Sequence, residues 1–212
     1  PIPLAGRTIR SYYTFRFAAA DDPLAVPDLR YGFTLQMVGD IGLGVPTDCG
    51  PESGSGVLPL ANIWGGHSLI VETDIYASAA NNDPPGNHTA IMKNGYLIHP
   101  LGAVPACNGT SNLCLHTPVD TFEESPTPLS HNQRMEIITG CNSGCGTCAP
   151  GLHADPNTFA KVSVWVDCTN CSDVAVPVDR VAQPPTVQIC SDLNPSGETA
   201  LNQIYVGFTG GF

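Results

Sequence analysis

Residues 161–167 of the chain read Lys-Val-Ser-Val-Trp-Val-Asp, and this stretch decides the fold class. A valine occupies every second position, and the valines alternate with lysine, serine and tryptophan. Successive side chains of a β-strand point to opposite faces, so a period of two residues indicates a strand with one buried face. The sequence therefore predicts a half-buried strand over Lys161–Asp167.

Similar stretches, rich in β-branched or aromatic residues, recur along the chain. They are Ser11–Phe17, Tyr31–Val38, Ser68–Ser78, His88–Lys93, Tyr96–Leu101, Arg134–Thr139 and Gln203–Thr209. Asn94-Gly95, between two of them, predicts a two-residue hairpin turn. The 22 Gly and 20 Pro interrupt helices, and no helical apolar period is found over about ten residues. We therefore expect one domain, residues 1–212, folded as an all-β sandwich with long loops.

The composition excludes several classes of protein. Eight Lys and Arg against 19 Asp and Glu give a net charge of −11, which is the wrong sign for binding nucleic acid or an anionic membrane. Charged residues make up 13% and hydrophobic residues 42%, so the chain is not a disordered acidic tail. No apolar run approaches the ~18 residues that membrane insertion requires. The chain begins at Pro1, and we expect it to be processed or part of a longer chain.

Nine cysteines are many for a cytosolic protein and usual for an exported one. They are Cys49, Cys107, Cys114, Cys141, Cys145, Cys148, Cys168, Cys171 and Cys190. Their number predicts disulfides with one thiol left over. The alternative is a four-cysteine zinc site, because two Cys-x-x-Cys pairs, at 145–148 and 168–171, have a spacing close to such a pattern. We favour disulfides and a secreted or cell-surface protein.

The densest group of potential metal ligands lies between Glu72 and His88. Glu72 and Asp74 are two residues apart on a predicted strand, so both carboxylates project from one face. Burying them would be costly unless a cation neutralised them. The following loop supplies Asp83 and His88. Carboxylate oxygens suit Ca²⁺, and carboxylates combined with an imidazole suit Mn²⁺ or another transition metal.

This segment resembles the metal-binding region of the legume-type (L-type) lectins, the concanavalin-like family. Their pattern places Glu-x-Asp-x-aromatic-x-Asn on a strand, followed by an Asp-Pro loop that ends in His. Other similar segments follow in the family's order: Tyr31–Asp40, Ser53–Gly56, Val162–Asp167 and Tyr205–Gly210. The resemblance covers the chain from about Ser11 to Phe212. It implies an antiparallel jelly-roll sandwich, elaborated here by a Cys-rich loop that the plant members lack.

The resemblance also implies adjacent Ca²⁺ and Mn²⁺ sites. Asp74 and Asp83 would bridge the two ions, and Glu72 and His88 would complete the transition-metal site. The main-chain carbonyl of Tyr76 would join the calcium shell. In the family, calcium orders the loop that presents the sugar ligands.

The sugar-binding residues follow from the same resemblance. Asp40 would accept hydrogen bonds from sugar hydroxyls, and a backbone N–H near Gly54 and Gly56 would donate one. Ser78 stands where the family has an Asn that binds calcium and contacts the sugar, so Ser78 is assigned to both sites. The expected function is therefore an extracellular carbohydrate-binding module whose partners are glycans.

Two other classes of protein share features of this sequence. Several glycoside hydrolases with this sandwich carry Glu-x-Asp-x-(x)-Glu, in which the last Glu is the general acid/base. Tyr76 and Ala77 occupy that position here, so the leaving group would not be protonated and we expect no enzyme. The second alternative is a structural subunit of an extracellular sheath, filament or appendage with structural metal only. An incomplete set of edge strands and an odd cysteine would favour self-association or assembly with other extracellular subunits.

Overall fold

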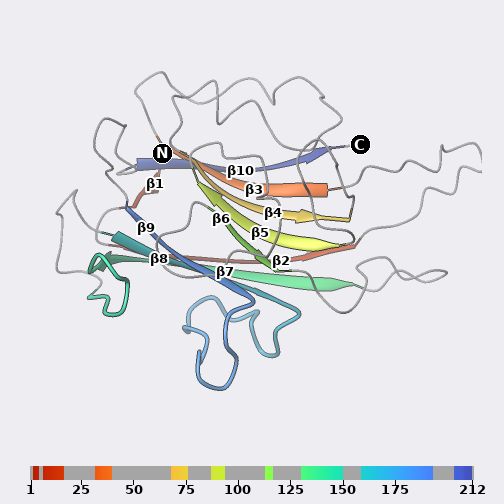
Figure 1. The fold of residues 1–212 in the computed structure, drawn as a ribbon. Coiled ribbons are helices and arrows are strands. Elements are labelled where there is room, and N and C mark those ends of the chain that lie inside the picture. The colour runs from red at the N-terminus through yellow and green to blue at the C-terminus, as the bar shows by residue number, and fades with distance from the viewer. Residues whose placement is uncertain are drawn as a thin grey trace, which may run out of the picture.

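The computed structural model describes residues 2–4, 7–16, 32–39, 68–75, 87–93, 113–116, 130–149, 159–192 and 203–211. The regular elements of this part of the chain are all β-strands, and they form two antiparallel sheets stacked face to face (Figure 1). The six-stranded sheet has the order β1-β10-β3-β4-β5-β6. Its strands are β1 (Ile2–Pro3), β10 (Gln203–Gly211), β3 (Gly32–Gly39), β4 (Ser68–Asp74), β5 (His88–Lys93) and β6 (Leu113–His116).

The second sheet has four strands in the order β2-β7-β8-β9. They are β2 (Thr8–Phe15), β7 (His131–Cys141), β8 (Phe159–Val166) and β9 (Val187–Asp192). Most neighbours follow one another along the chain, but β10 pairs with β1 and β3, and β2 pairs with β7, so the chain crosses between the two layers. The prediction of an all-β antiparallel jelly-roll sandwich is confirmed.

The main core lies between the two sheets. The six-stranded sheet contributes Leu35, Met37, Leu69, Val71, Ile91 and Ile204, and the four-stranded sheet contributes Met135, Ile137, Ala160, Val162, Val164, Val187 and Ile189. Each set follows the alternation of its strands, because only every second side chain faces the opposite sheet. The two-residue period at 161–167 thus placed Val162 and Val164 in the core as predicted.

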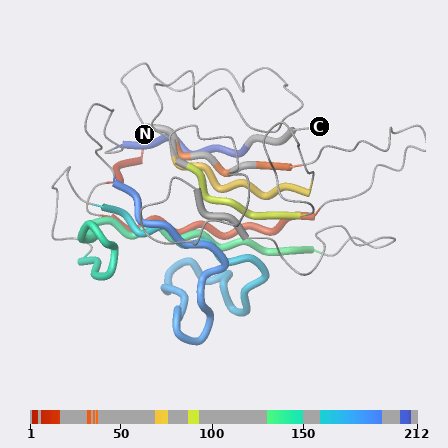
Figure 2. Tube along the Cα trace, viewed as in Figure 1, coloured from red at the N-terminus to blue at the C-terminus, as the bar shows by residue number. Residues whose placement is uncertain are grey.

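The other face of β8 is buried as well, which the half-buried pattern did not predict. Ser163 is fully buried and Trp165 is 1% exposed, because residues 167–186 fold back over the outer face of the four-stranded sheet (Figure 2). This segment, called the 167–186 loop below, accepts a hydrogen bond from Trp165 Nε1 at the carbonyl of Gln183 (2.8 Å). The strand itself ends at Val166, one residue earlier than predicted, since Asp167 has a left-handed φ of 53°.

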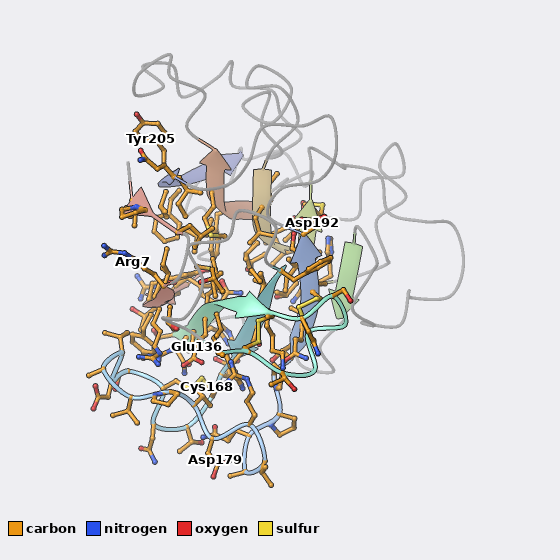
Figure 3. The ribbon with its side chains drawn as sticks, turned by 90° about the vertical axis from the view of Figure 1, so that its left-hand side faces the viewer. Arg7, Glu136, Cys168, Asp179, Asp192 and Tyr205 are labelled. Atoms are coloured by element: carbon orange, nitrogen blue, oxygen red, sulfur yellow. A yellow bond between two sulfur atoms is a disulfide. The ribbon has the colours of Figure 1, made fainter. Side chains whose placement is uncertain are left out.

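A buried ion cluster fastens the 167–186 loop to the sheet. Glu136 on β7 is fully buried and receives Arg134 (2.8 Å), Arg180 (3.0 Å) and Arg10 (3.4 Å). Arg134 is itself buried and donates to the carbonyls of three loop residues. In Figure 3, Glu136 lies between the sheet and the loop that carries Cys168 and, at its far end, Asp179. The carboxylate therefore holds together the strands and the loop that covers them.

Three disulfides lie in the described part of the chain. They are Cys141–Cys148, Cys145–Cys190 and Cys168–Cys171. The disulfide prediction is confirmed for these cysteines, and the zinc alternative is wrong because each of its four sulfurs bonds to another cysteine. Cys49 and Cys107 lie outside the described residues, and only the backbone of Cys114 is described.

Most strand predictions are confirmed with shifted ends, and three strands were missed. β1, β6 and β9 were not predicted from the sequence. The stretch Tyr96–Leu101 and the hairpin expected at Asn94-Gly95 lie outside the described residues. The edge of β5 that this hairpin would use pairs with β6 instead. Within the described residues, no helix has the length and apolar character needed to cross a bilayer.

Candidate metal centre

Three of the predicted metal ligands meet at one end of the six-stranded sheet. Glu72 and Asp74 lie at the end of β4, and His88 is the first residue of β5. The register places Asp74 opposite His88, with Glu72 two pairs further along, opposite Ala90. The alternation that sends Val71 into the core sends both carboxylates to the other face of the sheet.

The three side chains converge closely enough to share one cation. One ligand atom from each of Glu72, Asp74 and His88 lies within 4.8 Å of the other two. The contact between Glu72 Oε2 and His88 Nε2 is 3.4 Å. We call these residues the acidic triad. Two carboxylates and one imidazole are the donor set for a divalent ion that accepts both oxygen and nitrogen.

Burial gives this arrangement its chemical significance. Glu72 is 4% exposed and His88 is fully buried, while Asp74 is half-buried. On the same face, Ile70, Ala90 and Met92 form a second buried apolar cluster beside the triad. Two carboxylates in such surroundings repel each other and lose hydration, and a bound cation would offset both costs. The donors therefore fit a divalent metal.

Gly32 on β3 is required for this geometry, which sequence reasoning missed. Gly32 pairs with Asp74 across the β3–β4 ladder. A Cβ atom at this glycine would lie 2.9 Å from Asp74 Oδ1 and 3.0 Å from its Cγ. Any larger residue would therefore push the carboxylate away from the triad. The glycine at the start of an otherwise bulky strand was the available signal.

A hydrogen bond behind the triad fixes β4 to the opposite sheet. Thr73, between the two acidic residues, points into the sandwich, and its hydroxyl accepts from Gln133 Nε2 at 3.2 Å. Both side chains are fully buried. Buried polar groups that bond only to each other specify one register, because sliding either strand would leave both unsatisfied. Gln133 was also missed, although an amide inside an apolar strand is a recognisable signal.

The remaining predicted ligands lie outside the described residues. For the metal site these are Tyr76, Ser78 and Asp83, and for the sugar site they are Asp40, Gly54, Gly56 and again Ser78. Their roles remain predictions.

The strand before Asp40, β3, starts beside the triad and ends away from it. β3 runs antiparallel to β4, with Gly32 opposite Asp74 and Val38 opposite Ser68. Gly39, the chain neighbour of Asp40, therefore lies at the far end of β3, and seven residues of strand at ~3.4 Å each separate it from Gly32.

No protein family model matches the chain. No curated protein matches it either. Among solved structures, a peanut lectin in complex with a 9-residue peptide is similar, with a TM-score of 0.44 and 13% sequence identity. The match covers 99% of this chain and 66% of that lectin chain, so the chain spans just under two thirds of the lectin's length. The similarity concerns the fold and assigns a role to no residue.

Proposed function

We propose that the protein is an extracellular, non-catalytic carbohydrate-binding module in which divalent metal orders the sugar-binding surface. The observation that carries the proposal is the acidic triad. Glu72, Asp74 and His88 bring two carboxylates and an imidazole to one partly desolvated point at the end of two adjacent strands. A bound cation would stabilise such a group of buried ligands by neutralising its carboxylates.

The metals proposed are Ca²⁺ and a neighbouring Mn²⁺ or other transition metal. Glu72 and His88 would favour the transition metal, since imidazole nitrogen is a poor ligand for calcium. Asp74, half-buried at the strand end, would bridge toward calcium together with Asp83, Tyr76 and Ser78. The metal would supply positive charge and a fixed coordination geometry. The chain contributes a site whose backbone is already held by the β3–β4 and β4–β5 pairings.

Sugar binding is proposed for the surface beside the triad. Sugar hydroxyls come in adjacent donor–acceptor pairs, and a carboxylate with a nearby backbone N–H matches such a pair when both are oriented beforehand. Asp40 is the predicted carboxylate, and Ser78 and the Gly54–Gly56 segment are the other predicted contributors. We expect affinity on the order of 0.1–1 mM per site, because an exposed site buries little area and displaces ordered water.

The metal part of the proposal is tested by calorimetric titration of Ca²⁺ and Mn²⁺ into Asp74→Asn. The substitution keeps the size of the side chain and removes its charge, so we expect at least a tenfold loss of affinity, or about 1.4 kcal/mol. Asp179→Asn is the matched control. The Asp179 carboxylate accepts hydrogen bonds from backbone N–H groups of the 167–186 loop, and the amide oxygen of asparagine can still accept them. Equal affinities in the two variants would contradict the metal site.

The sugar part is tested on a glycan array with metal-loaded protein, before and after chelation. Binding that disappears with the metal supports the proposal. Metal binding without any glycan retained on the array would replace it with the second candidate, a structural subunit with structural metal only. That candidate has its own support in the three disulfides and in the exposed apolar side chains of β10. The disulfides favour a secreted or cell-surface location for both candidates.

A further inference from the structure

The Cys168–Cys171 disulfide differs in its surroundings from the other two disulfides of the described residues. Those two belong to one buried cluster at the ends of β7, β8 and β9, in which Phe159 packs against Cys141, Cys145 and Cys190. The Cys168–Cys171 disulfide lies outside this cluster, on the 167–186 loop (Figure 3), and Cys168 is half-buried. Its cysteines are three positions apart and join no strands. Because the stabilisation from a disulfide rises with the length of chain that it closes, the fold depends least on this one.

Residues 168–171, called the CxxC turn below, are anchored at both ends by groups other than sulfur. Before the turn, Asp167 donates its N–H to the carbonyl of Asn132 (2.8 Å) and accepts from the N–H of Asn132 (3.0 Å). At its end, the carbonyl of Cys171 accepts from Nη1 of the buried Arg134 (3.1 Å). These contacts would keep the two cysteines near each other with the disulfide open. The bond can therefore break and form again without the loop leaving the sheet.

The middle of the CxxC turn depends on the disulfide. Asn170 has a left-handed φ of 58°, a conformation that costs free energy for a residue other than glycine. Such a conformation persists where the surrounding structure enforces it, and here the ring closed by the two sulfurs does so. An open chain would relax it. We therefore expect Thr169 and Asn170 to move when the disulfide breaks.

Thr169 in turn holds the segment that covers Trp165. The side-chain amide of Gln183 binds both backbone groups of Thr169, since Oε1 accepts from the N–H (2.8 Å) and Nε2 donates to the carbonyl (2.7 Å). The backbone carbonyl of Gln183 accepts from Trp165 Nε1 (2.8 Å), and Trp165 is 1% exposed. A chain of contacts thus leads from the disulfide through Thr169 and Gln183 to the buried indole.

We propose that the Cys168–Cys171 disulfide is a site of reversible exchange with an external dithiol, and that its opening uncovers Trp165. A thiolate of the dithiol attacks the sulfur of Cys168, the more exposed cysteine, and Cys171 leaves as a thiolate that takes a proton from solvent. The second thiol then attacks the mixed disulfide, which releases Cys168 and converts the reagent to a cyclic disulfide. Two electrons and two protons pass from the dithiol to the protein, and an oxidised dithiol reverses the reaction.

The exchange is tested by following each cysteine of the whole, folded chain. The protein is incubated with about 1 mM dithiothreitol, trapped with iodoacetamide at intervals and mapped by peptide mass spectrometry. We expect alkylation of Cys168 and Cys171 to be at least about tenfold faster than that of the cysteines in the buried cluster, because a reagent reaches those only after local unfolding. Reoxidation before trapping should protect Cys168 and Cys171 again. Equal rates for both groups, or faster reaction of the buried cluster, overturn the proposal.

The link to Trp165 is tested by acrylamide quenching of tryptophan fluorescence in the oxidised and the reduced protein. We expect the quenching constant to rise at least about twofold on reduction, because the indole gains access to solvent. The change should be absent in Trp165→Phe, which assigns it to Trp165 and not to Trp64, the other tryptophan of the chain. Cys168→Ser/Cys171→Ser should be quenched like the reduced protein, with or without dithiol. No rise in the wild type, or quenching of the double variant like the oxidised protein, contradicts the link.

Gln183→Leu examines the link without changing a cysteine. The variant loses both side-chain contacts with Thr169, so its Trp165 should be quenched readily while the disulfide is closed, and reduction should add little. Gln188→Leu is the matched control, since Gln188 accepts from Ser163 on the same face of the sheet and does not contact the CxxC turn. It should respond to reduction as the wild type does. A wild-type response in Gln183→Leu contradicts the proposed route. These measurements involve neither metal nor sugar, so their outcome is independent of the proposed function.

Discussion

Asp74 and His88 face each other as the last register pair between β4 and β5. This pairing places an imidazole against a carboxylate at the point where both strands leave the sheet, with Glu72 completing the triad. The strand ladders hold the backbone of all three residues before any ligand arrives. A metal bound here therefore stabilises the folded state directly, because an unfolded chain has no such site.

The first prediction concerns stability with and without metal. Ca²⁺ at about one hundred times its Kd should add about 2.7 kcal/mol to the free energy of unfolding, which corresponds to roughly 5 to 10 °C in Tm. Differential scanning calorimetry with Ca²⁺ and with chelator measures the difference. Asp74→Asn should show the same Tm in both conditions. A metal-induced rise that survives in this variant would place the metal elsewhere.

The second prediction uses the close approach of Gly32 to Asp74. Gly32→Ala should lower metal affinity about tenfold or more, because the new methyl displaces the carboxylate that it would contact at 2.9 Å. Gly207→Ala, where the added Cβ meets nothing within 4 Å, should bind metal as the wild type does. Calorimetric titration of both variants gives the comparison. If Gly32→Ala retains full affinity, Asp74 is not a ligand in its present rotamer.

The third prediction concerns the buried ion cluster. Glu136→Gln should destabilise the protein by about 3–5 kcal/mol, because it leaves the buried Arg134 without its counter-charge. The damage should appear first as proteolytic cleavage within the 167–186 loop, which Arg134 and Arg180 tie to the sheet. Denaturant unfolding and limited proteolysis measure the two effects. The control is Asp173→Asn. This side chain lies on the same loop but is not the carboxylate that pairs with the arginines, so we expect little change in stability or cleavage.

The fourth prediction is a loss of stability at high pH that originates at Tyr13. Burial raises the pKa of the Tyr13 hydroxyl well above its ordinary value near 10. The folded state thus holds its proton more tightly than the unfolded state, so the contribution is complete below pH ~10 and declines as the pH rises further. Thermal unfolding from neutral to alkaline pH should show this decline in the wild type.

Tyr13→Phe should remove that part of the alkaline decline. At neutral pH it should be neutral or slightly stabilising, because the Tyr13 hydroxyl is buried with no hydrogen-bond partner among the described residues. Tyr12→Phe, on the opposite face of β2, is the matched control and should keep the wild-type profile. An identical alkaline decline in wild type and Tyr13→Phe would assign the effect to other groups.

Local pattern was sufficient for most of the strands and for the two carboxylates of the triad. The alternation in residues 161–167 placed Val162 and Val164 in the core, and the spacing of Glu72 and Asp74 set both carboxylates on one face. Both results follow from the two-residue period of a strand, a property of neighbouring residues alone. The many cysteines likewise indicated disulfides, although not which ones pair, since connectivity depends on distances in space.

The tertiary structure decided whatever depends on residues distant in the sequence. The 167–186 loop buries Trp165 on a face that its pattern assigned to solvent, and the antiparallel register sets Gly32 opposite Asp74. Gly32 and Gln133 owe their importance to partners on other strands, at Asp74 and Thr73. Sequence by itself determined which way each side chain points along its own strand. Only the pairing of strands decided what each side chain meets there, because that contact is made across the sandwich and not along the chain.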